Sequence, residues 1–165
     1  MSAEVASAAH ISPDGRFRWS LSRTWDDNAE PLVWLMLNPS TADAEVDDPT
    51  IRRCMGFARD RGYGGIVVVN LFAYRATKPS DLVDAFKAGW IDGVDMDVNR
   101  ASVGVAAAQR DVVAAWGAHP ITRQVRHGID VRADARNVWC LGRTKDGYPR
   151  HPLYVKADQP FEVYP

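Results

Sequence analysis

The sequence predicts an α/β fold in which helices cover both faces of a central parallel sheet. Three features indicate it: short apolar runs at 32–37, 66–70, 111–116 and 137–141, helical periodicity between these runs, and polar residues where the runs end. Uninterrupted apolar runs are typical of strands buried on both faces, and strands that alternate with helices favour parallel pairing. At 165 residues, we expect one domain over 1–165.

Composition narrows the function classes. The formal net charge of −1 argues against strong general affinity for nucleic acid, although a local basic face is compatible with it. No apolar run is long enough to span a bilayer, and MSAEVASAAH lacks the pattern of a signal peptide. Cys54 and Cys140 lie far apart and form no metal-binding spacing. We therefore expect a cytoplasmic protein with no membrane partner, no metal and no cofactor.

The N-terminal segment 6–23 is expected to form a β-hairpin. Its turn is Ser12-Pro13-Asp14-Gly15, in which proline fixes φ and glycine accepts a positive φ. Phe17, Trp19 and Leu21 alternate with polar residues, which is typical of a strand with one buried face.

Four helices are expected in the segments between the four apolar runs. The first begins at Asp48-Pro49, an N-cap followed by proline, and ends near Arg61. The others are expected at 79–87, at 92–110 and at 118–129, the last of them ending at Gly128. In the helix at 92–110, the predicted core contacts are Val94, Val98, Val105 and Ala108.

Polar side chains at the strand ends are the candidate ligand contacts, because ligands of open α/β sheets bind at the carboxyl edge. Asn38 and Asn70 each end an apolar run, and an amide can pair with the edge of a nucleobase. His151 lies in the basic, turn-rich tail after the last run, where an imidazole can donate to a developing anion. Each of these residues also has an ordinary structural reading, as a turn asparagine or a surface histidine.

The order of the motifs resembles the uracil-DNA glycosylase superfamily. LMLNPSTAD (35–43) is similar to its first motif, in the branch with Asn-Pro in place of Asp-Pro, and GGIVVVNLFAYRA (64–76) is similar to its base-reading strand. DVVAAWGAHP (111–120) resembles its third strand, and RHPLYV (150–155) its His-Pro motif. NPSTAD, NLFA, WG and GYPRHPLY also resemble a bacterial family described only as a domain of unknown function.

The resemblance implies a three-layer sandwich with a central four-stranded parallel sheet, preceded here by the hairpin. It also implies a DNA-repair hydrolase that cleaves the N-glycosidic bond of a flipped base, uracil or another modified base. Asn38 would position the attacking water, Asn70 would read the base, and His151 would stabilise the departing base. Leu153 would be the wedge. The implied contacts to phosphate or backbone are Ser40, Thr41, Arg143, Lys145 and Arg150.

This chain departs from the superfamily pattern at three points. Met36 stands where the superfamily has a glycine, and Leu153 replaces the serine after His-Pro. No aromatic platform follows the first motif closely, so Phe72 or Tyr74 is expected to stack on the base.

Other interpretations remain open. The same pocket would also suit a protein that binds or hydrolyses a free nucleotide or nucleoside, or a non-catalytic relative that binds nucleic acid or a protein. A basic rim would favour DNA, a neutral or acidic rim a free nucleotide, and a pocket blocked by Met36 or the tail a non-catalytic role. The acidic loop 41–48 is expected to be solvated with one N-cap, and His10, His119 and His127 to be surface residues.

Overall fold

The computed structural model describes residues 5–125 and 129–165 as an α/β fold around a seven-stranded mixed sheet. The strands are β1 (Ala6–Ile11), β2 (Arg18–Thr24), β3 (Pro31–Met36), β4 (Gly65–Asn70), β5 (Asp111–Ala114), β6 (Asn137–Cys140) and β7 (Glu162–Val163). The α-helices are α1 (Pro49–Arg59), α2 (Pro79–Lys87) and α3 (Gly93–Ala107). Short 3-10 turns are η1 (Pro120–Gln124), η2 (Val131–Ala133) and η3 (Pro152–Tyr154).

The sheet has the order β1-β2-β4-β3-β5-β6-β7. The four apolar runs form its parallel centre, β4-β3-β5-β6, as predicted. The expectation of a four-stranded sheet was nevertheless incomplete. The N-terminal hairpin extends the sheet, because β2 pairs antiparallel with β4, and β7 pairs antiparallel with β6. The two-residue β7 carries too little pattern to be recognised in the sequence.

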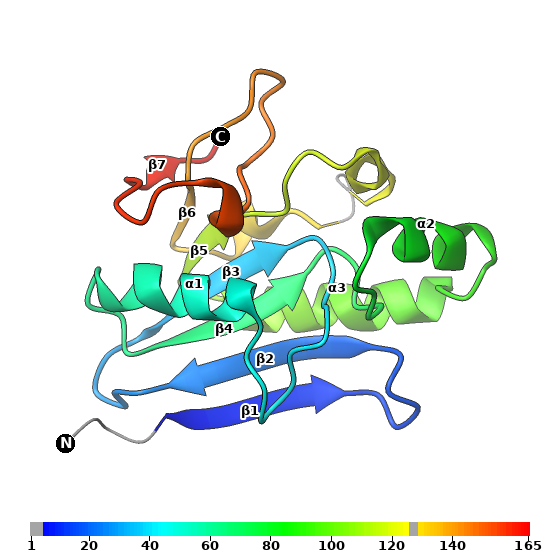
Figure 1. Cartoon of the computed structure of the whole chain (residues 1–165), viewed down its shortest axis with the longest axis horizontal. Helices are drawn as coiled ribbons and strands as arrows, with labels where there is room; N and C mark the ends of the chain where they lie inside the picture. Colours follow the sequence, from blue (N-terminus) through cyan, green and yellow to red (C-terminus); the bar gives the residue numbers. More distant parts are fainter. Residues whose placement is uncertain (1–4, 126–128) are drawn as a thin grey trace.

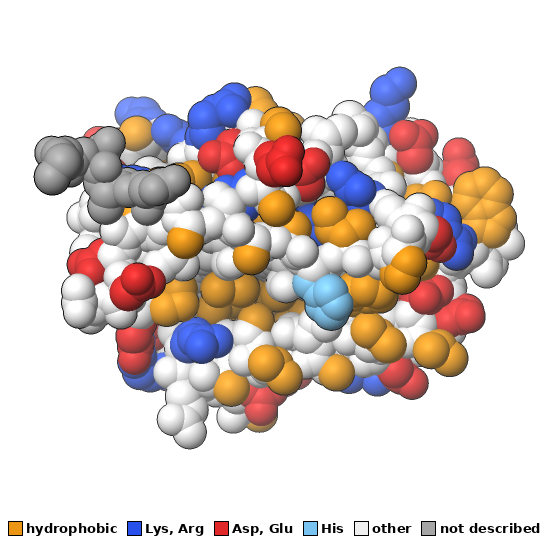
Figure 2. All heavy atoms as spheres, turned by 90° about the horizontal axis from the view of Figure 1, so that it is seen from below, with side chains coloured by type: hydrophobic (Ala, Val, Ile, Leu, Met, Phe, Trp, Pro, Cys, Tyr) orange, Lys and Arg blue, Asp and Glu red, His pale blue; other side chains and the backbone are white. Residues whose placement is uncertain are grey.

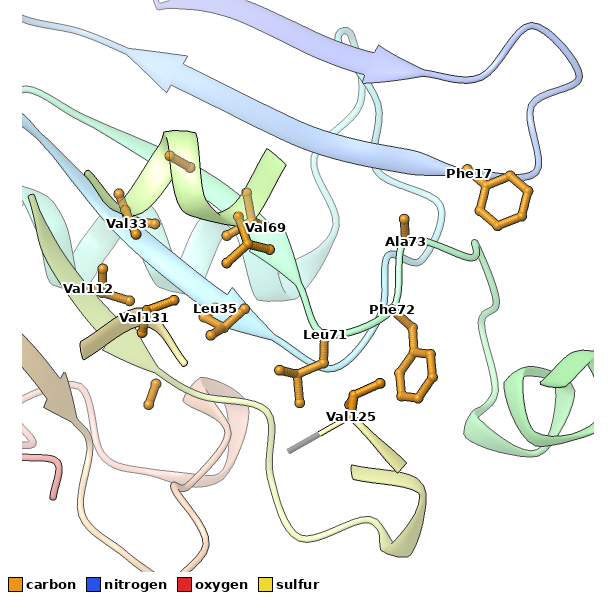
Figure 3. Close-up of a cluster of buried hydrophobic side chains, with 14 of the residues drawn as sticks. Phe17, Val33, Leu35, Val69, Leu71, Phe72, Ala73, Val112, Val125 and Val131 are labelled. Atoms are coloured by element: carbon orange, nitrogen blue, oxygen red, sulfur yellow. The ribbon is translucent and has the colours of Figure 1, made fainter. Parts of the chain in front are cut away.

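Helices cover both faces of the sheet, with α1 in front of it and α3 behind it in Figure 1. Alternate side chains of β3 enter two different cores: Leu32 and Trp34 pack on the α1 side, and Val33 and Leu35 on the α3 side. Figure 3 shows Val33 and Leu35 among the second group. The strand is apolar along its whole length because its side chains are buried on both faces of the sheet. Burial of each such side chain contributes about 1.5–3 kcal/mol to the stability of the fold.

Two helix predictions were wrong in detail. The side chains of Val94, Val98 and Val105 are exposed, as is Ala108 just after α3. The buried face of α3 instead carries Asn99, Val103, Ala106 and Ala107. The helix contains many small residues, so the spacing of its valines did not identify the buried face. The helix expected at 118–129 is replaced by the short turn η1, and its expected end at Gly128 lies outside the described residues.

Backbone hydrogen bonds join the loops that leave β3 and β4. The N–H groups of Leu71 and Phe72 donate to the carbonyls of Met36 and Leu37 (2.8 and 2.9 Å), and Ala76 donates to Pro39 (2.9 Å). The chain after Asn70 is thereby held alongside the chain after Met36. This arrangement fixes both strand-end asparagines at the same carboxyl edge of the sheet.

Figure 2 shows the face of the molecule on the side of β1. Hydrophobic side chains lie there between lysine or arginine and aspartate or glutamate side chains, with neither sign of charge dominating. Within the described residues 5–125 and 129–165, no helix is long and apolar enough to cross a membrane.

Candidate functional site

A pocket of about 440 Å³ lies at the carboxyl edge of the parallel strands. It brings together five of the residues singled out in the sequence, which are Asn38, Ser40, Asn70, His151 and Leu153. Further residues with polar or aromatic side chains also line it: Arg18, Asp48, Thr50, Thr77, Trp116, His119 and Tyr154. Three strand-end segments and the C-terminal tail therefore meet at one cavity, which Met36 lines without filling.

The amide of Asn38 is oriented by the loop around it. Its Nδ2 donates to the carbonyl oxygens of Pro39 (3.0 Å) and Ala76 (2.8 Å). Both donors of the amide are thus used within the protein, and Oδ1 is the atom left for a ligand. An acceptor in this position suits the orientation of a water molecule.

Asn70 ends β4 and is only 1% exposed, yet its Nδ2 has no hydrogen-bond partner among the described residues. Its backbone is held from behind by Asn99 of α3, whose side-chain amide donates to the carbonyls of Asn70 (2.9 Å) and Leu71 (3.0 Å). A buried donor without a partner costs about 1–3 kcal/mol. Such a donor at the wall of a pocket is free to pair with an acceptor that a ligand brings.

The ring of His151 is fixed by its own turn. Nδ1 accepts from the backbone N–H of Leu153 (3.2 Å) at the start of η3, so the proton of the neutral ring lies on Nε2. Burial lowers the pKa of His151 below its ordinary 6.5, against a smaller opposing effect of Asp48. At neutral pH the pocket therefore contains an uncharged imidazole with an N–H to donate.

The lowered pKa of His151 predicts a pH effect on stability. The unfolded chain binds a proton at about 6.5 and the folded chain only at lower pH, so protonation favours unfolding. We expect the free energy of unfolding to fall as the pH drops from about 6.5 through the folded pKa, and to lose this dependence on His151 above 6.5. Urea denaturation of the wild type and His151→Gln between pH 5 and 7.5 measures the difference; equal slopes for the two proteins would contradict it.

His119 was expected on the surface, but it is half-buried and lines the pocket. Its Nδ1 accepts from the backbone N–H of Ile121 (3.3 Å), the same arrangement that fixes His151. The sequence did carry a signal for it, because His119-Pro120 repeats the His-Pro of 151–152. An aromatic residue that had not been predicted, Trp116, also lines the pocket, whereas Phe72 and Tyr74, the expected aromatic contacts, do not.

The predicted aromatic platforms lie elsewhere. Phe72 is fully buried and packs edge-on against Phe86, with ring centroids 5.9 Å apart. Tyr74 packs edge-on against Phe17 at 5.8 Å. Both side chains complete the core behind the loop, and neither is among the residues that line the pocket. Trp116 and Tyr154 are the aromatic residues that a ligand in the pocket would meet.

The basic residues of the tail also lie away from the pocket lining. Arg143, Lys145 and Arg150 are exposed in the 142–150 segment, where Arg143 and Pro149 form a bridge. Thr41 is exposed in the loop after β3. Of the five expected phosphate contacts, Ser40 lines the pocket. The structure thus does not bring a basic tail to this cavity.

The acidic loop 41–48 is stabilised by its own contacts. Asp43 accepts the N–H groups of Glu45 and Val46 (2.8 and 2.9 Å), which lowers the pKa of this carboxyl. Asp47 pairs with the buried Arg23 (2.7 Å). Among the described residues, no group of three or more His, Cys, Asp or Glu side chains comes together as a metal site.

Asp48 caps α1 as predicted and also lines the pocket. Its Oδ1 accepts from the N–H of Ile51 (2.8 Å), and its Oδ2 accepts from the hydroxyl of Ser40.

We expect Asp48→Ala to lower the free energy of unfolding by about 1 kcal/mol, through loss of the cap. Asp48→Asn keeps a capping oxygen and is expected to lose less; urea denaturation compares the two. An equal loss in both variants would mean that the charge, and not the cap, stabilises the helix.

A family model, described as a protein of unknown function (DUF1643), matches residues 18–153. No curated protein and no solved structure matches the chain. The matched span begins at Arg18 and ends at Leu153, and it therefore contains almost every residue that lines the pocket.

Proposed function

Because the chain belongs to the DUF1643 family of proteins of unknown function, which brings no activity with it, we propose a function from the pocket itself. The proposal is hydrolysis of the N-glycosidic bond of a nucleoside or nucleotide. The observation that carries it is the meeting of Asn38, Asn70 and His151 in one cavity, with the Asn70 amide donor buried there and without a partner among the described residues.

Each of the three side chains has a role that its geometry favours. Asn70 offers its amide to the polar edge of a base, as amides do in base recognition. Asn38, with Nδ2 held by two carbonyls, offers Oδ1 to orient a water molecule. His151, neutral and protonated on Nε2, donates to the base as negative charge develops on it.

In the proposed reaction, the water oxygen forms a bond to C1′ of the sugar while the bond from C1′ to the base nitrogen breaks. The electron pair of that bond leaves with the base. The water releases one proton to solvent or to the Asp48 carboxylate, which lines the same pocket, and the base takes up one proton after it departs. Because the transition state resembles an oxocarbenium ion, positioning of a weak nucleophile is sufficient and a strong base is not required.

The charge and size of the pocket favour a free nucleoside or nucleotide over a DNA duplex. Among the described lining residues, Arg18 contributes a positive charge and Asp48 a negative one, while the basic tail side chains lie elsewhere. A volume of about 440 Å³ is in the range of small-molecule sites. Duplex binding usually relies on many phosphate contacts from lysine and arginine.

One observation favours a second candidate, the excision of a base from DNA. Leu153 and Tyr154 follow His151-Pro152 and are 44% and 81% exposed. Apolar side chains that project beside a pocket can fill the space that a flipped nucleotide leaves. This candidate also accords with the order of the four sequence motifs.

Release of free base, followed by chromatography, tests the proposal. Purified protein is incubated with ribo- and deoxyribonucleosides, their 5′-monophosphates, and oligonucleotides containing uracil, hypoxanthine or xanthine. The proposal expects free base from a mononucleoside or mononucleotide; release from oligonucleotides alone would favour the DNA candidate. Binding of these compounds without release of base would contradict hydrolysis and favour a non-catalytic binding protein.

A further inference from the structure

Arg18, the first residue of β2, is a buried guanidinium at the wall of the pocket. It is 2% exposed, and its Nη1 donates to the carbonyl oxygen of Ala42 (2.7 Å). Its Nε is buried and has no hydrogen-bond partner among the described residues. Nor does Arg18 form an ion pair with any described carboxylate.

Arg23, on the same strand and equally buried, is a structural arginine with which Arg18 can be compared. Its Nε and Nη2 contact Asp47 Oδ1 (2.8 and 2.7 Å), and the same guanidinium also donates to the carbonyls of Ser22 and Asp43. Arg23 also lies outside the described pocket lining, whereas Arg18 is part of it. Because a buried charge is costly unless it is paired, the incomplete set of partners around Arg18 leaves this guanidinium available to an anionic ligand.

We propose that Arg18 forms an anion subsite of the pocket and binds the phosphate group of a nucleotide. The identity of the molecule that carries this phosphate rests on the proposed function, whereas the subsite itself rests on Arg18. Guanidinium groups match phosphate oxygens in charge and geometry. Burial lowers the pKa of Arg18 to about 10, so the side chain remains charged at neutral pH.

The groups around Arg18 define the subsite further. Ser40, Thr50 and the N-terminal turn of the 11-residue helix α1 border the same cavity, and helix N-termini favour anions. Asp48 and Asp43 act against an anion, and Arg75 and Arg23 act in its favour. Asp48 already accepts hydrogen bonds from Ile51 and Ser40, which disperse its charge. Among the described residues that line the cavity, Arg18 is the lysine or arginine that contributes a positive charge.

The test compares Arg18→Met with Arg23→Met, the same change at equal burial on the same strand. Affinities for a nucleoside, its 5′-monophosphate and inorganic phosphate are measured by calorimetry at a temperature where all three proteins are folded. In the wild type, we expect the monophosphate to bind about 10- to 100-fold tighter than the nucleoside, and phosphate to compete with it. Arg18→Met should bring this ratio close to one without weakening nucleoside binding. Arg23→Met should keep the ratio while lowering the thermal midpoint.

Each outcome separates the subsite from the proposed function. Arg18-dependent phosphate binding without any release of base would keep the subsite and reject the hydrolase. Release of base from nucleosides and monophosphates with equal efficiency, unchanged in Arg18→Met, would reject the subsite and keep the hydrolase. An oligonucleotide with a 5′-hydroxyl, offered as competitor, distinguishes an internal phosphodiester from a terminal phosphate. Absence of phosphate binding to the folded wild type, or equal loss of every ligand in Arg18→Met, would overturn the subsite.

Discussion

Replacement of His151 by alanine is expected to lower the rate of base release by about 100- to 1000-fold, the usual cost of losing one donor to a developing anion. The neutral ring holds its proton on Nε2 because Nδ1 accepts from Leu153, so the wild-type protein has this donor in place before a ligand binds. Single-turnover rates at saturating substrate measure the effect on the chemical step.

Two variants make the His151 result specific. His10→Ala removes a histidine outside the described pocket lining and should leave the rate unchanged. His151→Gln keeps a side-chain donor and an acceptor for the N–H of Leu153, and should recover part of the lost rate. If His151→Ala reduces substrate affinity while the single-turnover rate stays at the wild-type value, the assignment of His151 as the donor is wrong.

Asn70→Asp is expected to weaken binding of a base-bearing ligand by about 100-fold, because a group that only accepts replaces the buried amide donor. The change is nearly isosteric, so the shape of the pocket is preserved. Affinity for the base, the nucleoside and the 5′-monophosphate can be followed by calorimetry.

The control for Asn70→Asp is Asn28→Asp, which makes the same change of charge at an exposed loop position and should leave affinity unchanged. A buried charge could prevent Asn70→Asp from folding. Asn70→Ala removes the donor without introducing a charge, and it should weaken binding as well. Retention of wild-type affinity in a folded Asn70→Ala protein would show that the base is read elsewhere.

The parallel centre of the sheet and the strand-end residues were accessible from the sequence for a physical reason. A strand buried on both faces must be apolar throughout, and Asn38 and Asn70 stand out because they interrupt such runs. Asp48-Pro49 likewise carries its own capping chemistry, and the cap is observed. In each case the pattern lies within a few neighbouring residues.

What the sequence did not reveal depends on contacts between distant segments. Arg18 reads as one of the polar residues of an alternating strand, and only the fold shows it to be buried beside Ala42 with no ion pair to a described carboxylate. Asn99 reads as an ordinary helix residue, yet it holds the end of β4. The prediction for the valines of α3 was wrong for a reason that lies within the helix itself. Many residues of α3 are small, so the positions of its valines do not determine which face packs against the sheet.

If Asn70 and His151 act on one ligand in one pocket, as proposed, the NMR signals of both side chains should respond together during a nucleotide titration. The Asn70 side-chain amide resonances are assigned by their loss in Asn70→Asp, and the His151 ring resonances by their loss in His151→Gln. We predict that both sets shift and saturate with the same dissociation constant. Saturable binding of the nucleotide that leaves both sets unchanged would contradict the claim.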